Sequence, residues 1–543
     1  MRSINFLSLT SGAIALLIFA PVLALMYESF FSASALNDDT FQNLAQSVLW
    51  DYIANSLQIV FGTLIFACLF AIAPAWWCAR YEFTGRRFLQ WAMVFPLAIP
   101  AYISAYVYTE ALDYAGPIQT SLRATFSWSS PNDYWFFDIR SITGASLMLA
   151  LALYPYIYLL LRNGFANQSD HLEHAGRLLG ANDRRIFFKI RLPLARPALA
   201  IGCTLVAMES LADFGTVHLF AISTLTTAIY DSWLVYGSLS TAAKISCLLL
   251  LFVLSLTWLE RKQREAQKHY DLKGSHSLTR KAPNPRQLTI IWLVCLSIIT
   301  LGFIIPLMTL IGYNLDYLTE NFNPALWQHA QHTFALAAGA GLICTVLALL
   351  FNANQRFNPK KLHAGQQNLA SIGYAIPGTV LAIAILIPLG AMDLGLNALL
   401  ESWNMDTVGL VFSGSSFALL MAFVIRFTAI ANGSVHSAYE HIPPNLDLAA
   451  RSLNTRSWPL FKDIHLPLIT PATISALLLV FIECVKELPA AILLRPFDFE
   501  TLSTYVYQFA SDEQLEHGAL AALLIIAVSL IPIFVLSRTQ RMS

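Results

Sequence analysis

Twelve apolar stretches of about 20 residues decide what this chain can fold into, because an α-helix of that length crosses the roughly 30 Å hydrocarbon layer of a bilayer. Of the 543 residues, 56% are hydrophobic and 12% are charged, whereas a soluble domain carries about 25% charge. The sequence therefore predicts an all-α polytopic membrane protein with 12 transmembrane helices. The stretches are centred near residues 20, 65, 99, 152, 209, 250, 301, 341, 379, 420, 482 and 527.

The distribution of basic residues predicts the orientation of these helices. Short cytoplasmic loops carry an excess of Lys and Arg. In this chain such residues gather in the second, fourth, eighth and tenth loops, for example at Arg80, Arg184, Arg356 and Lys462. The first, seventh and ninth loops lean acidic. We therefore expect the even loops and both termini to lie in the cytoplasm.

Composition also argues against several functions. The 33 basic and 33 acidic residues give a net charge of zero, so the electrostatic footprint of a nucleic-acid-binding protein is missing. The seven cysteines have no C-x-x-C spacing, and the 12 histidines show no metal-ligand spacing. The sequence has no G-x-x-x-x-G-K-S/T stretch, which would cradle nucleotide phosphates. We expect no catalytic residue and no cofactor in this chain.

Two segments superpose without a gap when Glu173 is aligned with Asp447. Residues 173–197 read EHAGRLLGANDRRIFFKIRLPLARP, and residues 447–471 read DLAARSLNTRSWPLFKDIHLPLITP. Such a repeat predicts a first repeat at 1–260, a basic cytoplasmic linker at 261–287 and a second repeat at 288–543. Six spans per repeat is an even number, so the two six-helix repeats are expected to be parallel.

Each repeated segment has the features of a docking element. Gly180 in one copy and Asn454 in the other are residue types that tolerate the left-handed backbone needed to turn the chain. A Leu-Pro pair then ends the second amphipathic piece before the next span begins. Small residues, which let a short helix lie close against another surface, stand together in both copies: Ala175, Gly176, Ala449 and Ala450.

These segments resemble the EAA loop of ABC importer permeases, whose pattern is a Glu-Ala-Ala group, a Gly and then I-x-L-P. The resemblance implies a MetI-like type I ABC importer permease fold, with each segment a coupling helix for one of two cytoplasmic ATPase subunits. ATP and Mg²⁺ would be bound by that partner. Departures at His174, Leu448 and Asn454 predict an unequal fit of the two repeats. The residues implied for coupling are Glu173, Ala175, Gly176, Arg177, Gly180, Asp447, Ala449, Ala450, Arg451 and Asn454.

The spans after these loops sharpen the resemblance. The stretches MESLADFGTVHLF (208–220) and VKELPAAILLRPFDFETLSTYVYQFASDE (485–513) are similar to fused ferric-iron permeases. That similarity implies a bacterial inner-membrane protein that receives Fe³⁺ from a periplasmic ferric-ion-binding protein. A permease for thiamine or a phosphonate remains an alternative, because those families share the EAA loop. An ion-coupled secondary transporter with 12 spans is disfavoured, since it has no use for duplicated docking loops.

Four acids in these spans predict a path for a cation. Glu209 and Asp213 stand at i, i+4, as do Glu483 and Glu487, a spacing that places each pair on one face of a helix. Inserting four unpaired acids would cost on the order of 10 kcal/mol, and a hard cation that prefers oxygen ligands supplies a reason for them. We therefore expect these acids, with Lys486, to line the path and to bind the ion transiently.

Structural ion pairs are the alternative explanation for the same acids. Lys486 stands three residues after Glu483 and could neutralise it. Arg495 could reach Glu487 or an acidic loop residue. Such pairs would fix helix packing without touching a transported ion, and the sequence leaves both interpretations open.

Overall fold

The computed structural model describes residues 2–36, 38–168, 170–271, 280–357, 361–453, 455 and 457–539. Within these residues every regular element is a helix, and the one extended pairing is an isolated bridge between Tyr81 and Lys281. Among the described residues, ten helices are long and apolar enough to cross a membrane, and two further pairs, each bent at a short break, raise the number to 12 if each pair is one span. The predicted all-α class is confirmed, and the prediction of 12 spans agrees with the larger of these two numbers.

Proline sets the break in one of the two bent pairs. The helices of Arg86–Ala98 and Ala101–Phe126 meet at an angle of 86°. Between them Ile99 is extended, with ψ 117°, because the residue before a proline, here Pro100, is pushed out of the α region. The other pair, Asp183–Leu194 and Arg196–Ala212, is bent by 67°.

The second repeat has the same proline break but a different continuation. Ile376 is extended before Pro377, with ψ 122°, and a helix then runs unbroken over Gly378–Ser402. The predicted centre near residue 379 was therefore wrong in position, as were those near residues 209 and 482, which lie close to the ends of their helices at Ala212 and Lys486. Residue 379 lies at the start of the ninth span, because the helix begins directly after Pro377 and its apolar run follows at residues 380–389.

The chain divides into two compact units that mix segments of both repeats. Unit 1 comprises Met1–Gln46, Ala228–Leu250 and Asn323–Tyr505, and unit 2 comprises Ser47–Thr227, Leu251–Phe322 and Val506–Ser543. The repeat is thus a division of the sequence, whereas the compact units cross it. Four helices have residues in both units: α3 (Asp39–Ser47), α14 (Leu225–Leu234), α15 (Leu239–Asp271) and α27 (Leu502–Ser511).

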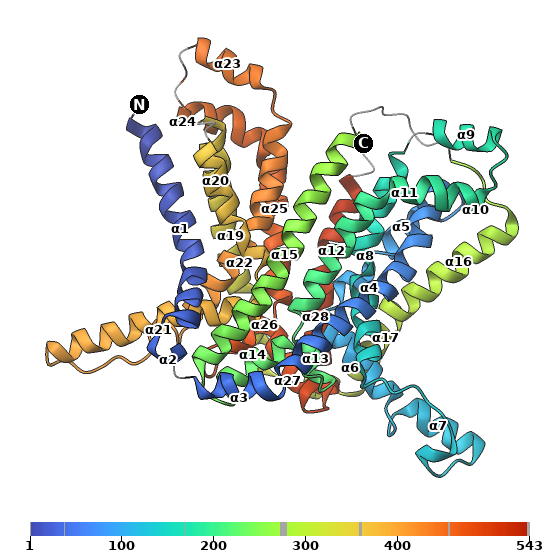
Figure 1. The fold of residues 1–543 in the computed structure, drawn as a ribbon, viewed down its shortest axis with the longest axis horizontal. Coiled ribbons are helices and arrows are strands. Elements are labelled where there is room, and N and C mark those ends of the chain that lie inside the picture. Colours follow the sequence, from blue (N-terminus) through green and yellow to red (C-terminus); the bar gives the residue numbers. More distant parts are fainter. Residues whose placement is uncertain are drawn as a thin grey trace. The chain divides into compact units, whose positions relative to one another are not determined.

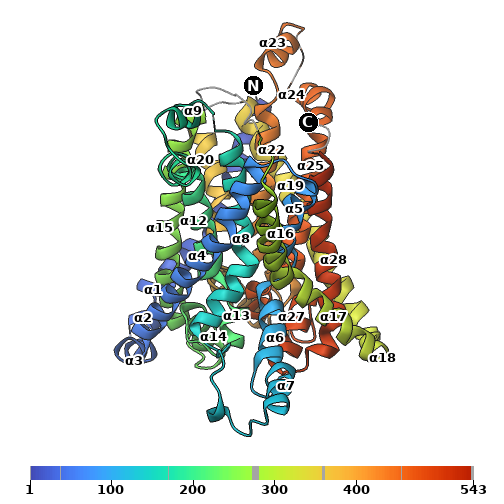
Figure 2. The ribbon, with the colours of Figure 1, turned by 90° about the vertical axis from the view of Figure 1, so that its right-hand side faces the viewer.

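Unit 2 is built around α4, α8 and α12, which pack against one another (Figure 1). Helices α16 and α17, from the second repeat, pack on α4 and α6 of the first. The short helices α9 and α7 lie at opposite ends of this unit (Figure 2). Its elements are α4 (Leu49–Arg80), α5 (Arg86–Ala92), η1 (Phe95–Ala98), α6 (Ala101–Leu112), α7 (Pro117–Phe126), η2 (Pro131–Asp133), α8 (Ile142–Ala166), α9 (His171–Leu178), α10 (Asp183–Ile186), η3 (Phe187–Arg191), α11 (Leu192–Leu194), α12 (Arg196–Ala212), α13 (Gly215–Leu219), α16 (Pro285–Ile299), η4 (Thr300–Ile304), α17 (Ile305–Asp316), α18 (Leu318–Asn321) and α28 (Leu515–Thr539).

Unit 1 repeats this arrangement with α19, α22 and α25 at its centre. Helix α1, from the first repeat, packs on α20 and α21 of the second. The first span of each repeat therefore packs on the core helices of the other repeat. The elements of unit 1 are α1 (Arg2–Phe30), α2 (Ala33–Leu36), α19 (Pro324–Phe357), α20 (Lys361–Ala370), η5 (Ile372–Ala375), α21 (Gly378–Ser402), α22 (Ser416–Glu440), α23 (Pro444–Ser452), α24 (Ser457–Leu460), η6 (Phe461–His465), α25 (Leu466–Lys486) and α26 (Pro489–Leu494).

Close contact between α8 and α12 generates a stability prediction at Gly202. A Cβ added there would lie 2.9 Å from the backbone Cα of Ile157, which cannot move aside as a flexible side chain could. We expect Gly202→Ala to lower the free energy of unfolding by about 1–3 kcal/mol, measured by thermal unfolding of the purified chain in nanodiscs. Gly433→Ala in α22 is the matched control, because nothing lies within 4 Å of its Cβ position. Equal unfolding temperatures for both variants would contradict the prediction.

Candidate functional site

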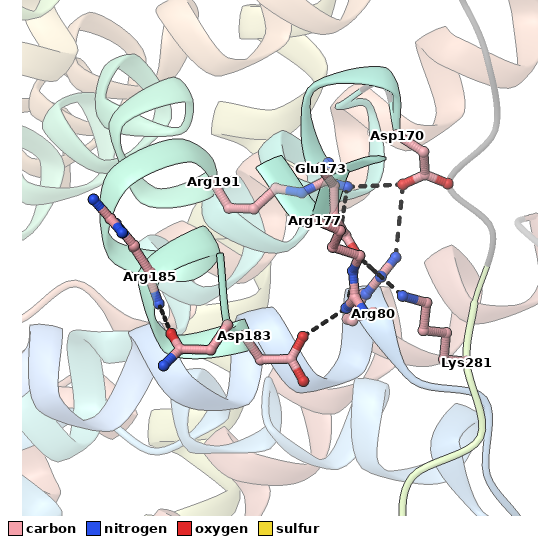
Figure 3. A network of polar contacts seen from close by, with 9 residues as sticks. Arg80, Asp170, Glu173, Arg177, Asp183, Arg185, Arg191 and Lys281 are labelled. Atoms are coloured by element: carbon pink, nitrogen blue, oxygen red, sulfur yellow. Dashed lines mark hydrogen bonds and ion pairs between the residues drawn. The ribbon is translucent and has the colours of Figure 1, made fainter. Parts of the chain in front are cut away.

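The first repeated segment is held to the rest of unit 2 by one buried carboxylate, that of Glu173 in α9 (Figure 3). Its side chain is 1% exposed. Oε2 accepts a hydrogen bond from Arg191 Nη2 at 2.7 Å, and Oε1 accepts one from Lys281 Nζ at 3.0 Å. Arg177 Nη2 lies 3.2 Å from Oε1, and Arg80 also donates to it. Four cations from four places along the chain therefore meet at one side chain.

These contacts outweigh the cost of burying the charge. Burial raises the pKa of Glu173, but the hydrogen bonds from Arg191 and Lys281 and the charge of Arg80 lower it more, so its pKa lies below its ordinary value. Asp170 shares the same cations, with Arg191 Nη2 at 2.7 Å and Arg80 Nη1 at 3.6 Å. A buried charge is tolerated when it is paired in this way. The network fixes α9 to the end of α4 and to the π-helical turn η3.

The two glycines of the segment are needed for different structural reasons. A Cβ on Gly176 would lie 2.9 Å from Ile190 Cδ1, so the small residue permits close packing. Gly180 has a φ of 79° with nothing within 4 Å, so this glycine serves the left-handed turn and not close packing. The close approach and the turn predicted from the sequence are present at these positions. Ala175 points outward and is exposed.

Exposed leucines beside this anchored helix were not among the predicted site residues. Leu178 and Leu179 are 89% and 87% exposed, and Leu172 is 51% exposed. Clustered apolar side chains at the surface mark an interaction site. In the second copy Leu448 and Leu453 are 62% and 80% exposed. The repeat itself could have revealed the pair Leu179 and Leu453, which superpose when Glu173 is aligned with Asp447.

The second segment is also held by a carboxylate, but one of its partners is a histidine, which is charged only when it is protonated. Asp447 accepts a hydrogen bond from Arg356 Nε at 2.7 Å and lies 2.8 Å from His465 Nε2. Burial raises the pKa of Asp447, whereas its contacts with His465 and Arg356 lower it more, and the net pKa lies below the ordinary value. Ala450 is buried and Ala449 is exposed. The backbone of Arg451 lies in α23, and Asn454 lies outside the described residues.

Corresponding residues hold the two carboxylates in place. Arg80 ends α4 and Arg356 lies in the last turn of α19, the matching span of the second repeat. Arg191 and His465 superpose in the alignment of the two segments, and each is the last residue of a π-helical turn, η3 or η6. Sequence reasoning missed these anchors because it treated the basic residues only as signs of orientation. A basic residue at the same place in both copies was the available signal.

The acids of the following spans lie where their helices end. Helix α12 ends at Ala212 and α25 at Lys486, and the next residues, Asp213 and Glu487, have extended backbones. Their φ values of −67° and −69° are still helical, so the Cα–Cβ bond of each acid keeps its place four residues after Glu209 or Glu483. The second acid of each pair is thus the last residue on its helical face, because its extended ψ turns the chain into a further short helix.

Each of these two acids caps the short helix that follows. Asp213 Oδ2 accepts from the backbone N–H of Thr216 at 3.0 Å and of Val217 at 3.2 Å, at the start of α13. Glu487 Oε1 accepts from the N–H of Ala490 at 3.2 Å, at the start of α26. A carboxylate at a helix N-terminus satisfies free donors and the helix dipole. The two acids thus stabilise the break between the two helices in both repeats.

At each break, a hydroxyl group from a later part of the chain binds the backbone carbonyl of the acid. Thr226 Oγ1 donates to the carbonyl of Asp213 at 2.7 Å, and Ser503 Oγ donates to the carbonyl of Glu487 at 2.7 Å. Upstream of these, Ser56 Oγ accepts from the N–H of Leu225. Thr333 Oγ1 accepts in the same way from the N–H of Leu502. The two breaks are therefore copies of one hydrogen-bonded structure.

A small polar pocket lies beside the break of unit 2. It is partly open and has room for about one water molecule. Glu209 lies close enough to Asp213 to interact with it electrostatically. Carboxylate and hydroxyl oxygens on its wall are the ligand types that hard cations prefer. The pocket is lined by Ser56, Ile59, Ser210, Leu211, Asp213, Val217, Thr224 and Thr226.

In unit 1 the equivalent acids contact cations. Lys486 Nζ lies 3.1 Å from Glu483 Oε1, and Arg426 Nη1 lies 3.3 Å from Glu487 Oε1. Arg495 pairs with Glu500. With the repeats aligned as above, the first has Ala212 and Ala152 where the second has Lys486 and Arg426. The ion pairs named as the structural alternative are thus present in the second repeat.

Among the described residues, no group of three or more His, Cys, Asp or Glu could hold a metal ion.

Comparison with known proteins defines the class. Two stretches, residues 69–265 and 344–542, match the family of binding-protein-dependent transport system inner membrane components. The chain belongs to this family and carries its domain twice, as two fused copies of an ABC importer permease. The predicted MetI-like fold is confirmed.

Particular relatives differ in substrate and in length. The chain is 24% identical over 501 residues to the Fe(3+)-transport system permease protein FbpB 2 of Haemophilus influenzae, with 90% of each chain covered. It is 22% identical over 510 residues to the thiamine transport system permease protein ThiP of Escherichia coli, covering 91% of this chain and 89% of that one. The molybdenum transport system permease protein ModB of Escherichia coli is 28% identical over 229 residues, which is 40% of this chain and 95% of ModB.

The buried carboxylate of Glu173 predicts a pH dependence of stability. Because its folded pKa is lowered, the carboxylate stabilises the fold above the ordinary pKa of about 4.3, and this contribution is lost as the pH falls through the folded pKa. We expect Glu173→Gln to lower the free energy of unfolding by about 3 kcal/mol at neutral pH, since Arg191 stays buried. Between about pH 5 and pH 3, the variant should lose less stability than the wild type.

Thermal unfolding across this pH range is the measurement. Glu513→Gln is the matched control, because Glu513 also contacts an arginine but is 69% exposed. It should follow the wild type at every pH. Identical pH profiles for Glu173→Gln and the wild type would contradict a role of this carboxylate in stability.

Proposed function

We propose that this chain is the membrane subunit of an ATP-driven importer that moves Fe³⁺ delivered by a periplasmic ferric-ion-binding protein. The observation that carries the proposal is the match over 90% of both chains to a relative named for Fe(3+) transport. The acids at the breaks support it, because carboxylates attract a hard cation and repel an oxyanion such as molybdate.

Two copies of an ATPase subunit dock on the segments of α9 and α23. Support comes from the exposed leucines of both segments and from the anchored carboxylates Glu173 and Asp447, which would transmit force. Glu173, Ala175, Gly176, Arg177 and Gly180 serve the first coupling site. Asp447, Ala449, Ala450, Arg451 and Asn454 serve the second. ATP and Mg²⁺ bind to these partners.

The coupling segments and both termini face the cytoplasm of a bacterium, with the chain in its inner membrane. The excess of Lys and Arg in the even loops supports this orientation. Within unit 2, α9 and the longest loop, which includes α7, lie at opposite ends (Figure 1), as alternation of the loops across the membrane requires.

Force on α9 reaches the acids along one helix. Glu173 binds Arg191, which ends η3 and precedes α11 and α12. Helix α12 spans 17 residues, about 25 Å at 1.5 Å per residue, and ends beside Asp213. A displacement of α9 as the ATPases close would therefore move the break and its pocket. This links nucleotide hydrolysis to the opening of the path.

The path for the ion follows the acids Glu209 and Asp213 of the first repeat and Glu483 and Glu487 of the second. In the first repeat, the pocket oxygens offer transient ligands. In the second, Lys486 and Arg426 limit how tightly a cation can bind near the acids. A weak, shared set of contacts suits an ion that must leave as readily as it enters.

Thiamine is the second candidate substrate, because a thiamine permease also matches 91% of the chain. Thiamine is an organic cation, so the acids alone do not separate it from Fe³⁺. Stimulation of ATP hydrolysis by an iron-loaded or a thiamine-loaded binding protein, in the reconstituted complex, separates the two.

Removing one acid from each repeat tests the path. Glu209→Gln combined with Glu483→Gln should abolish uptake of radioactive iron into proteoliposomes, because the ion loses a charged ligand in both repeats. The ATPase should still co-purify with the variant. Asp316→Asn, at an acid that ends α17, is the control and should transport normally. Full iron uptake by the double variant would remove these acids from the path.

The exposed leucines test the docking surface. Leu179→Asp combined with Leu453→Asp should reduce co-purification of the ATPase at least tenfold, since a charge replaces an apolar contact on each coupling segment. Leu36→Asp is the control, because Leu36 is 72% exposed but ends the first candidate span, far along the chain from both segments. Undiminished ATPase recovery from the double variant would place the docking surface elsewhere.

A further inference from the structure

The end of the linker between the repeats is attached to the first coupling site. Lys281 forms the isolated bridge with Tyr81: its N–H donates to the carbonyl of Arg80 at 3.2 Å, and its carbonyl accepts from the N–H of Glu82 at 3.0 Å. Its side chain then reaches Glu173 Oε1 at 3.0 Å (Figure 3). One residue of the linker thus joins the end of α4 to α9 through both backbone and side chain.

Residues 280–284, which we call the strap, are held at both ends. On one side Arg280 Nη1 lies 3.5 Å from Glu82, next to the bridge. On the other side the strap leads into α16 through a capping box of Asn284 and Gln287, with Pro285 at the first helical position. These are the residue types that begin a helix sharply. The strap is therefore attached to the end of α4 on one side and to the start of α16 on the other.

Helix α16 packs tightly on the turn that the strap joins. Gly85 has a φ of 84°, and a Cβ there would lie 2.5 Å from Trp292 of α16. No other residue type combines this backbone conformation with so close a ring. The turn after α4, the strap and the start of α16 consequently form one packed structure against the first coupling site.

From this geometry we propose that the strap is a working part of the first coupling site, with Lys281 as a positioning residue that fixes α9. The proposal rests on the proposed function, in which an ATPase subunit pushes on α9. It adds that α16, the first span of the second repeat, is tied to the coupling segment of the first repeat. Movement of α9 would therefore be shared between α12 and α16.

The second coupling site is held differently. The described partners of Asp447 come from α19 and from the turn η6 of its own segment. Glu173 has the corresponding partners Arg80 and Arg191 and, in addition, Lys281 from outside its own repeat. Among the described residues, the first coupling site is thus held by one more ion pair from outside its own repeat than the second. A linker that only joined the repeats would not need a lysine at a buried carboxylate.

Amide hydrogen exchange of the complete permease in nanodiscs tests the proposal. Lys281→Gln should speed exchange in residues 170–180 by up to about fivefold, the range expected for losing a partly exposed ion pair. Exchange in residues 444–453 should be unchanged in the same sample. Lys281→Arg should restore protection, because it keeps the charge and the reach. Arg286→Gln is the matched control, since Arg286 is exposed and five residues further along.

A functional readout accompanies the exchange measurement. With the ATPase subunit bound, Lys281→Gln should lower the stimulation of ATP hydrolysis by the loaded binding protein, and Lys281→Arg and Arg286→Gln should not. Wild-type exchange in residues 170–180 of Lys281→Gln would overturn the proposal. The exchange arm uses no substrate, so failure of iron to stimulate the wild-type complex would count against the proposed function and leave this test intact.

Discussion

A carboxylate held by basic side chains at the base of each repeated segment is the interaction on which the rest of this structure depends. Glu173 and Asp447 each connect a short, partly exposed helix to the end of a long span and to a π-helical turn. A buried ion pair is costly to break from one side, so the short helix moves with the spans. A surface helix without such an anchor would bend under load and transmit little force.

The same principle recurs at the breaks after α12 and α25. Asp213 and Glu487 end their spans by capping the next short helix, and a threonine or serine hydroxyl closes on the carbonyl of each acid. Charged groups therefore serve two purposes there, since they hold the break and also place oxygen atoms near it. Structural and ion-path explanations for these acids are compatible, because a cap leaves further carboxylate lone pairs available.

Differences between the repeats fit a chain that has fused two permease domains and let them diverge. The second repeat has Lys486 and Arg426 where the first has alanines, and it has His465 where the first has Arg191. The first repeat has in turn acquired a contact from the strap. Duplication preserved the backbone design, including the proline breaks and π-helical turns, while the charges around it changed independently.

From the sequence alone follow the helical class, the membrane-spanning stretches, the duplication and the positions of both repeated segments, because hydrophobic length and repeat spacing are local properties of the chain. Gly180 could be assigned to a left-handed turn on the same ground. The sequence did not determine which cations reach Glu173, the ends of the helices before Asp213 and Glu487, or the packing of each first span on the other repeat. Those depend on contacts between residues far apart in the chain, such as Glu173 and Lys281, which tertiary packing alone selects.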